Sequence, residues 1–272
     1  MDEFGLIDEI VDALGPDSRA QWIEVGSGDD AAVVAVSPGA SAVSSIDAFI
    51  PEVHFPTSAN PADVGYRAFM ASASDLAAMA ATPRYALVAL SLPAYERDYV
   101  LGLCQGMAQA AKVCGMAICG GNLTKGPLNI TVSVHGEVNA GTAVLRSGAQ
   151  VGDLVQVSGP LGRAAACVRL QAYAEDSPLR SAYFHPQARV DLVDVVARAN
   201  AAVDISDGCL QDIAHIAKGS AVRVLVDSHR VPVGEGANLE DALWGGDDYE
   251  LVATATEALD GFVVIGEVAT SS

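Results

Sequence analysis

The chain has 272 residues, enough for two ordinary domains or one large one, and 51% of its residues are hydrophobic, so it can bury a substantial core. The 34 acidic residues outnumber the 15 basic ones and give a formal net charge of −19. This charge argues against binding to nucleic acid or to an anionic membrane surface, because both need clustered cations. Acidic patches are compatible with Mg²⁺ binding.

The cysteines and the N-terminus indicate the compartment of the protein. There are 5 cysteines and no C-x-x-C spacing, so neither a disulfide framework nor a zinc site is indicated. The first ten residues are acidic where a secretory signal peptide would be basic, and no apolar run reaches the roughly 18–20 residues that span a bilayer. We therefore expect a cytoplasmic protein without a membrane partner.

Helices and strands interleave along the chain, which favours an α/β or mixed α+β fold. A change of composition near residues 140–150 predicts a boundary between an N-terminal domain, 1–145, and a C-terminal domain, 146–272. The apolar periods predict helices over 4–14, 60–82 (stopped by Pro83), 96–115, 187–199, and one after Gly162. They predict strands over 31–36, 41–47, 85–92, 128–138, 222–226, 262–268, and a short one from 116 that ends at Gly120-Gly121.

The stretch 201–219 joins a short apolar strand to a helix through a turn that carries Asp204 and Asp207. Ser206 or Asp207 can cap this helix, its buried face is expected at 210, 213, 214 and 217, and Gly219 is expected to end it. A helix start offers N–H groups to a phosphate, but two carboxylates would repel that phosphate unless a cation lay between them. The turn thus favours metal–phosphate chemistry, although a helix cap beside a strand end explains one such turn equally well.

Two common nucleotide-binding motifs are excluded. The sequence G-x-x-x-x-G-K-[ST] is absent, and Asp29 and Asp30 in GSGDDA would repel the pyrophosphate that a dinucleotide turn must hold. Acidic positions flanked by small residues remain, and their hard oxygen ligands select Mg²⁺ or Ca²⁺. These positions are Asp29/Asp30, Asp47, Asp75, Asp204/Asp207 and Asp247/Asp248. Together they predict a metal–nucleotide site.

The order of the motifs GDDAAV, SIDAFIPEVHF, SDLAAMAA, GGNLTKGP, RSGAQVGD, DISDG and GGDDYEL resembles that of thiamine-monophosphate kinases over nearly the whole chain. The resemblance implies the two-domain fold of the aminoimidazole ribonucleotide synthetase-like group. In that fold an N-terminal α/β domain binds ATP and Mg²⁺ and forms a β-barrel across a homodimer, a C-terminal α/β domain follows, and nucleotide lies in the cleft between the domains.

Residue by residue, the resemblance implies three sets of ligands. The Mg²⁺ ligands would be Asp30, Ser45, Asp47, Asp75, Asn122, Asp204 and Asp207. ATP would contact Gly121, Asn122, Arg146 and Ser206, and the acceptor would contact His54 and Asp247. The acceptor is a phosphate monoester whose oxygen attacks the γ-phosphoryl group directly, so the resemblance implies no catalytic base. Magnesium ions and positioning would carry the reaction.

The sequence departs from the family pattern at four points. Asn122 stands where the family has Asp in GGD, Ile46 replaces the usual Thr before Asp47, and Asp247 replaces Glu in GGEDYEL. The neutral amide of Asn122 can coordinate Mg²⁺ but should bind it more weakly than a carboxylate. Family members usually continue beyond the last strand and supply an aromatic residue that stacks on the substrate, whereas this sequence ends at Ser272, so we expect a shortened C-terminal domain.

Three hypotheses for function follow. The first is an ATP- and Mg²⁺-dependent kinase that makes thiamine diphosphate from thiamine monophosphate. The second is a divergent paralogue that phosphorylates or activates another small molecule in a specialised pathway, which the motif changes favour. The third is a catalytically weak nucleotide-binding protein, for which Asn122 is the main support.

Overall fold

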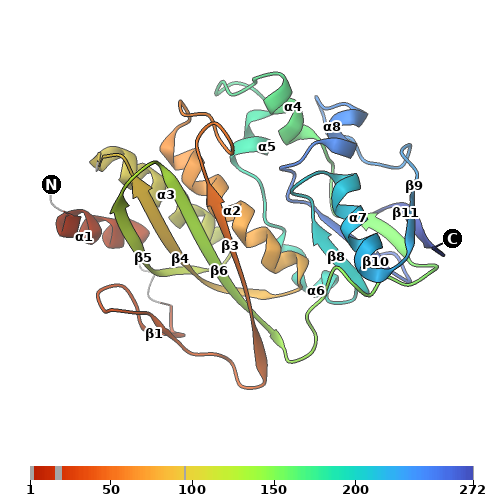
Figure 1. Ribbon diagram of the computed structural model, residues 1–272, viewed down its shortest axis with the longest axis horizontal. Helices are drawn as coiled ribbons and strands as arrows, with labels where there is room; N and C mark the ends of the chain where they lie inside the picture. Colours follow the sequence, from red (N-terminus) through yellow and green to blue (C-terminus); the bar gives the residue numbers. More distant parts are fainter. Residues whose placement is uncertain (1–2, 16–19, 95, 272) are drawn as a thin grey trace. The chain divides into compact units, whose positions relative to one another are not determined.

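The computed structural model describes residues 3–15, 20–94 and 96–271, and none of the helices in those ranges is long and apolar enough to cross a membrane. The chain divides into two compact units (Figure 1). Unit 1 comprises Met1–Leu76 and Pro83–Asn139, and unit 2 comprises Ala77–Thr82 and Ala140–Ser272. Each unit has its own main sheet, and unit 1 also contains a sheet of two short strands.

The sheet of unit 1 has four strands in the order β3-β6-β4-β5, so β3 and β5 form its two edges. Strands β3 and β6 are antiparallel, whereas β4 and β5 are parallel and are joined by the crossover helix α3. Up to residue 139 the elements are α1 (Glu3–Leu14), β1 (Ile23–Val25), β2 (Val33–Val34), β3 (Ala40–Phe49), α2 (Pro61–Ala78), β4 (Thr82–Leu92), α3 (Arg97–Val113), β5 (Ala117–Lys125) and β6 (Asn129–Asn139).

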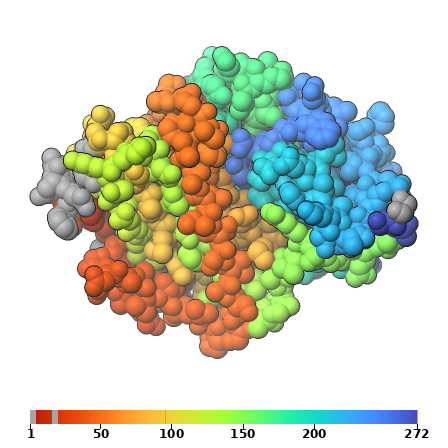
Figure 2. All heavy atoms as spheres, viewed as in Figure 1, coloured from red at the N-terminus to blue at the C-terminus, as the bar shows by residue number. Residues whose placement is uncertain are grey.

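One face of this sheet is covered by helices and the other is open. Along β6, Ile130, Val132 and Val134 are fully buried, whereas the residues between them are partly exposed, as the strict alternation of the sequence predicts. Helices α2 and α3 lie behind the sheet in Figure 1. On the opposite face, β3 in orange and β6 in light green form part of the molecular surface (Figure 2).

Three predicted boundaries in unit 1 are wrong. The helix expected to reach residue 82 ends at Ala78, because the chain turns through Ala80 in the left-handed region at φ 55°. Pro83 is therefore the second residue of β4, a position near the strand start that tolerates the missing N–H. Strand β5 continues through Gly120 and Gly121 to Lys125 instead of turning there, and β3 runs two residues past Asp47 to Phe49.

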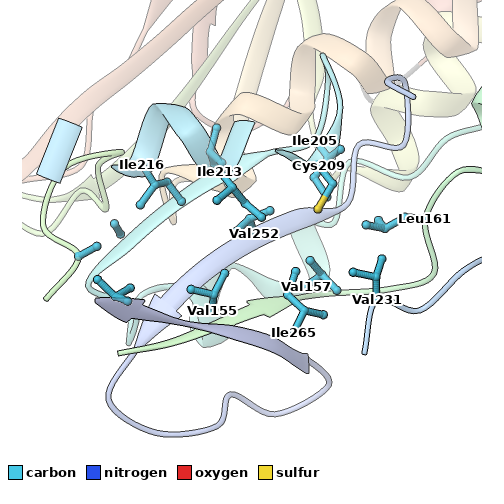
Figure 3. Packing of buried hydrophobic residues seen from close by; sticks show 14 of the residues in the cluster. Val155, Val157, Leu161, Ile205, Cys209, Ile213, Ile216, Val231, Val252 and Ile265 are labelled. Atoms are coloured by element: carbon cyan, nitrogen blue, oxygen red, sulfur yellow. The ribbon is translucent and has the colours of Figure 1, made fainter. Parts of the chain in front are cut away.

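Unit 2 has a five-stranded antiparallel sheet in the order β8-β10-β7-β11-β9. One face packs against helix α7 through a cluster that includes Ile213, Ile216 and Val252 (Figure 3). The other face packs against a second cluster that includes Leu192 and Val196. The elements are β7 (Leu154–Val157), α4 (Arg163–Arg169), α5 (Arg180–Phe184), η2 (Val190–Leu192), α6 (Val193–Val196), β8 (Ala201–Asp204), α7 (Cys209–Ser220), β9 (Arg223–Val226), α8 (Leu239–Trp244), β10 (Leu251–Ala255) and β11 (Val263–Ala269).

The single helix predicted over 187–199 is wrong. Arg189 has a left-handed backbone at φ 48°, and only the short helices η2 and α6 follow it. The guanidinium of Arg189 forms an ion pair with Glu250 and donates to the carbonyl oxygen of Ser158 at 3.0 Å. This tertiary anchor holds Arg189 in a conformation that a continuous helix would not allow.

Helix α7 also differs from its prediction. Its N-cap is Gly208 instead of Ser206 or Asp207, Gly219 lies inside the helix, and Ala221 closes it with φ 55°. The buried residues are Cys209, Asp212, Ile213 and Ile216, so the buried face is rotated from the expected one and includes a carboxylate. Cys209 is buried, as are the other four cysteines.

Candidate functional site

Two carboxylates predicted to bind metal lie together in unit 1. Asp47 is on β3, Asp75 is on α2, and Ser45 on β3 donates its hydroxyl hydrogen to Asp75 Oδ2. The pKa of Asp47 is raised, first by burial and then by the charge of Asp75, while a hydrogen bond with Ser72 and the charge of His54 oppose the rise. Ser45, Asp47 and Asp75 are called the carboxylate pair site below.

His54, a predicted acceptor ligand, lies beside the carboxylate pair site. Its Nδ1 accepts the N–H of Ile50 at 3.0 Å, and its ring meets that of Phe49 edge-on at 5.5 Å between centroids. The hydrogen bond at Nδ1 leaves a proton of the neutral ring on Nε2. His54 can therefore donate from Nε2 to an anionic oxygen.

The carboxylate pair site suits a hard divalent cation. Asp47 and Asp75 are close enough for like-charge repulsion, and their donors are hydroxyl groups rather than cationic side chains, apart from the opposing influence of His54. A Mg²⁺ ion prefers carboxylate and hydroxyl oxygens and would neutralise both carboxylates. These three residues therefore fit the metal that the sequence motifs imply.

Gly121 and Asn122 occupy the other edge of the same sheet, on β5. A Cβ atom at residue 121 would stand 1.9 Å from the carbonyl oxygen of Val88, so only glycine fits this contact between β5 and β4. Asn122 lines an open pocket of about 320 Å³ together with seven residues of β4, β5, β6 and the connection between β5 and β6. The pocket is lined by Ala89, Leu90, Ser91, Asn122, Thr124, Pro127, Asn129 and Thr131.

The carboxylate pair site and Asn122 are separated within one copy of unit 1. Three strand spacings of about 4.8 Å, roughly 14 Å in all, lie between the edges β3 and β5. The faces differ as well: Asp47 pairs with the fully buried Val132 on the helix side, whereas Asn122 shares its pocket with Thr131 on the open side. Two oxygens bound to one Mg²⁺ lie about 3 Å apart. One chain therefore cannot bring Asp47 and Asn122 to the same ion.

The segment that leads to Asp30 lies on the β5 side of unit 1. A Cβ atom at Gly26 would stand 3.9 Å from the carbonyl oxygen of Cys119 in β5. Asp29 and Asp30 are exposed, and Asp29 Oδ1 accepts the N–H of Asp30 at 2.8 Å. This loop therefore follows a segment that lies next to β5, the edge strand that carries Asn122.

In unit 2 the predicted residues of the DISDG motif form the turn between β8 and α7. Asp204 ends β8 and is buried, whereas Asp207 is exposed. Gly208 has φ 126°, and a Cβ atom there would stand 2.8 Å from the carbonyl oxygen of Trp244, so the turn requires glycine. The turn 204–208 is called the DISDG turn below.

Asp212 of helix α7 holds the DISDG turn from inside. Its Oδ2 accepts the backbone N–H groups of Ser206, Asp207 and Gly208, each at 3.1 Å. Burial raises the pKa of Asp212, these N–H groups lower it, and the charge of Asp207 adds to the rise. The carboxylate of Asp212 therefore occupies the N–H groups of the turn itself, which precede Cys209, the first residue of helix α7.

The loop 245–250 packs on the same turn. The N–H of Asp247 donates to the carbonyl oxygen of Ser206 at 2.9 Å, and the hydroxyl of Tyr249 donates to Asp247 Oδ1 at 3.0 Å. Both Asp247 and Tyr249 have positive φ, at 67° and 52°. The predicted acceptor ligand Asp247 is thus fixed beside the predicted nucleotide ligand Ser206 by strained backbone, a pattern that is frequent at functional sites.

Asp248 anchors this loop to the start of helix α4. Both of its carboxylate oxygens accept the N–H of Gly162 at 2.9 Å. The pKa of Asp248 is raised to about 8, mainly by burial, with the charges of Glu250 and Asp247 adding to the rise and the Gly162 hydrogen bond opposing it. Asp248 is therefore partly protonated near neutral pH.

Arg146 lies away from the DISDG turn. Its carbonyl oxygen accepts the hydroxyl of Ser220 at 3.4 Å, and Ser220 is the last residue of α7. The length of α7, about 18 Å at 1.5 Å per residue, separates that end from the turn. The structure of unit 2 thus joins Ser206, Asp207 and Asp247 but not Arg146.

Sequence reasoning missed Asp212 and Asp248 as the supports of the site. Asp212 follows Asp207 by five residues, and the sequence carries no signal for it, because the apolar period predicted a different buried face for α7. Asp248 was noticed only as a second acid beside Asp247, and nothing in the local sequence shows that Gly162 is its partner.

Comparison with known proteins extends the similarity to the whole chain. Residues 28–138 match the family described as AIR synthase related protein, N-terminal domain. The thiamine-monophosphate kinase of Salmonella typhimurium is 35% identical over 98% of this chain and 87% of its own. The crystal structure of thiamine-monophosphate kinase from Stenotrophomonas maltophilia has a TM-score of 0.90 at 33% identity and covers 100% of this chain and 95% of that one. A structure of AaThiL complexed with AMPPCP and TMP has a TM-score of 0.81 at 33% identity, covering 99% and 91%.

Proposed function

Because the chain belongs to the thiamine-monophosphate kinase family, we propose that it transfers the γ-phosphoryl group of ATP to thiamine monophosphate. The bond between the γ-phosphorus and the bridging oxygen to the β-phosphate breaks, a phosphate oxygen of the acceptor forms the new bond, and ADP and thiamine diphosphate leave. The observation that carries the proposal is the similarity over 99% of this chain to a structure complexed with AMPPCP and TMP. AMPPCP is an analogue of ATP in which a methylene group replaces the oxygen between the β- and γ-phosphates.

The chemistry of this transfer suits the residues at hand. A phosphate monoester oxygen is anionic at neutral pH, so it attacks without a general base. The protein must bring two polyanions together and align them, and positioning of this kind can supply much of the rate. We therefore assign no catalytic base to this chain, and His54 and Asp247 would orient the acceptor.

The role of Mg²⁺ follows from the carboxylates. We assign Ser45, Asp47 and Asp75 as ligands in unit 1, and Asp204 and Asp207 as ligands in unit 2. Bound Mg²⁺ would supply charge neutralisation between the two phosphate groups. The raised pKa of Asp47 beside Asp75 supports the first assignment, because a bound cation would relieve their repulsion. Nucleotide contacts are assigned to Gly121, Asn122, Arg146 and Ser206.

The separation of the two edges of unit 1 supports a homodimer with shared sites. Asp30 and Asn122 of one copy would approach the carboxylate pair site of the other if β3 of one sheet lay beside β5 of its partner, because the two edges would then be one strand spacing apart. Such closure would also form the barrel that the sequence motifs imply and would protect two long edge strands. Ile46 and Val53 support it further, because their side chains are 65% and 71% exposed in the single chain.

The function is tested by incubating the purified chain with Mg-ATP and thiamine monophosphate and measuring ADP and thiamine diphosphate. We expect one ADP for each thiamine diphosphate, and no turnover with thiamine, which lacks the acceptor phosphate. ATP that binds without being consumed would instead identify a nucleotide-binding protein. Turnover restricted to a different phosphate monoester would identify the divergent paralogue that the substitution at Asn122 allows.

The shared site is tested by mixing two inactive variants. Asp75→Asn removes a ligand on the β3 side, and Asn122→Lys places a cation on the β5 side. If sites are shared, a mixed dimer has one intact site and one doubly altered site, so an equal mixture regains roughly a quarter of wild-type activity. If each site is built within one chain, both sites of the mixed dimer stay defective and the mixture stays inactive.

A further inference from the structure

The backbone of the DISDG turn could bind an anion, but the carboxylate of Asp212 already occupies that position. Three consecutive backbone N–H groups that converge on one point can bind an anion such as phosphate or sulfate, and Ser206, Asp207 and Gly208 provide such a set directly before helix α7. Here all three converge on Asp212 Oδ2 at 3.1 Å, and Asp212 is 2% exposed. The space that a phosphate oxygen would take is filled by the protein.

This internal carboxylate changes which ligand the turn can hold. With its N–H groups turned toward Asp212, the turn presents the exposed carboxylate of Asp207, and Gln211 Nε2 donates to one of its oxygens at 3.2 Å. The ligand atoms of Asp207, Asp212 and His215 lie within 4.8 Å of one another. Oxygen ligands with negative charge select a cation, so the turn repels a bare phosphate and accepts one that arrives with a metal ion.

We propose that Asp212 is a positioning residue that converts the DISDG turn from an anion site into a cation-binding turn. Its carboxylate holds Ser206, Asp207 and Gly208 in a fixed conformation and excludes phosphate from their N–H groups. The inference rests on the proposed function for its consequence in catalysis, because a metal-bound nucleotide is the ligand the turn would then select. The structural statement about the turn stands independently of turnover.

A comparison within unit 2 shows why Asp212 is more than a helix cap. Asp241 is also buried at a helix start, where its Oδ2 accepts the N–H of Asn238 at 2.9 Å and the guanidinium of Arg169 pairs with it. That carboxylate neutralises a cation and takes a single backbone N–H. Asp212 accepts three backbone N–H groups and lies near a like charge, Asp207. Its carboxylate therefore stabilises the backbone of the turn.

The experiment compares Asp212→Asn, Asp212→Ala and the matched control Asp241→Asn. Binding of Mn²⁺, followed by paramagnetic resonance without nucleotide, should weaken about tenfold in both Asp212 variants, a typical loss when a group that orients metal ligands is removed. Inorganic phosphate, titrated calorimetrically into metal-free protein, should bind to Asp212→Ala but not to the wild type. Asp241→Asn should lower the melting temperature and leave both binding measurements unchanged.

Each result of these binding and stability measurements either supports or overturns the proposed role of Asp212. Unchanged Mn²⁺ binding in Asp212→Asn, or Asp212 variants that lose only thermal stability as Asp241→Asn does, would overturn it. If Asp212→Ala does not fold, Asp212→Asn keeps an acceptor oxygen for the three N–H groups and still tests the loss of charge. Wild-type protein without thiamine-monophosphate turnover, but with weakened Mn²⁺ binding in the variants, would reject the proposed function and retain the positioning role.

Discussion

The carboxylate pair site of unit 1 and the DISDG turn of unit 2 hold negative charge in different ways. Asp47 and Asp75 face each other with hydroxyl donors around them, and their mutual repulsion helps to raise the pKa of Asp47. Asp212 is buried more deeply than Asp47 and Asp75, but three backbone N–H groups compensate its carboxylate. The first region needs a cation to relieve this repulsion, whereas in the second the backbone compensates Asp212 and leaves Asp207 exposed to a ligand. Substitution of a carboxylate in the first region should therefore mainly affect ligand binding, whereas a substitution that disturbs the backbone of the turn should also affect folding.

The largest expected effect is that of Asp75→Asn on the carboxylate pair site. Removing one of two facing carboxylates should lower kinase activity by about 10³-fold, a size seen when one preorganised electrostatic group is lost. The metal-free protein should become slightly more stable, because the repulsion disappears. Enzyme assays and thermal unfolding in EDTA measure the two effects. Asp8→Asn, on the exposed side of α1, is the control, and a metal-free Asp75→Asn protein less stable than wild type would contradict the account.

Gly208→Ala should break the DISDG turn by destabilising the fold. Its backbone at φ 126° excludes an L-residue, and the new Cβ atom would stand 2.8 Å from the carbonyl oxygen of Trp244. We expect a loss of about 2–4 kcal/mol in the free energy of unfolding. Gly261→Ala is matched, since Gly261 has φ 81° with open space around it, and should cost about 1 kcal/mol. Equal losses in urea unfolding would show that the contact with Trp244 is unimportant.

Asp248 should make the stability of unit 2 depend on pH. Its pKa is about 8 in the folded protein, and it lies near 3.9 in the unfolded chain. The folded state thus binds more protons between these values, so stability falls as pH rises from about 4 to 8, by at most about 1.4 kcal/mol per pH unit. Asp248→Asn should flatten this part of the profile, measured as unfolding midpoints in EDTA. An unchanged slope would show that Asp248 is ionised in the folded protein.

The smallest expected effect is that of Asn122→Asp on the β5 edge. Restoring a carboxylate should lower the Mg²⁺ concentration for half-maximal activity by about 3- to 10-fold, because a charged ligand binds Mg²⁺ better than an amide. Asn129→Asp, in the same pocket, is the control and should leave that concentration unchanged. If both substitutions lower this Mg²⁺ concentration equally, any added negative charge in the pocket explains the effect, and Asn122 is not a specific Mg²⁺ ligand.

Local patterns predicted much of the fold, and tertiary contacts explain the rest. The alternation along β6 fixes its buried face, and the helix that became α3 was expected within two residues of its observed ends. The double glycine of β5 suggested a turn, yet Gly121 is required because the carbonyl of Val88 approaches it across the sheet. Arg189 interrupts a predicted helix because of Glu250, a residue 61 positions away.

The candidate site, like the fold, could be predicted from local sequence patterns only in part. Chain order predicted the acidic residues but not which of them are neighbours, because β3 and β5 become opposite edges only when the sheet forms. The apolar period of α7 suggested a buried face at 210, 213, 214 and 217, and the observed face admits Asp212 because three N–H groups of the turn satisfy its carboxylate. A period of hydrophobicity cannot reveal a polar residue whose partners make it suitable for burial.

The buried thiols described above can report local unfolding, because each reacts only when the fold opens around it. Burial raises the pKa of Cys104, Cys114 and Cys209 to about 12, so almost no thiolate is present at neutral pH and alkylating reagents find little to attack in the closed fold. Cys209 is the first residue of α7, directly after Gly208. Its rate of reaction with iodoacetamide therefore measures how often the start of that helix unravels, and a ligand that tightens the neighbouring turn would slow the labelling.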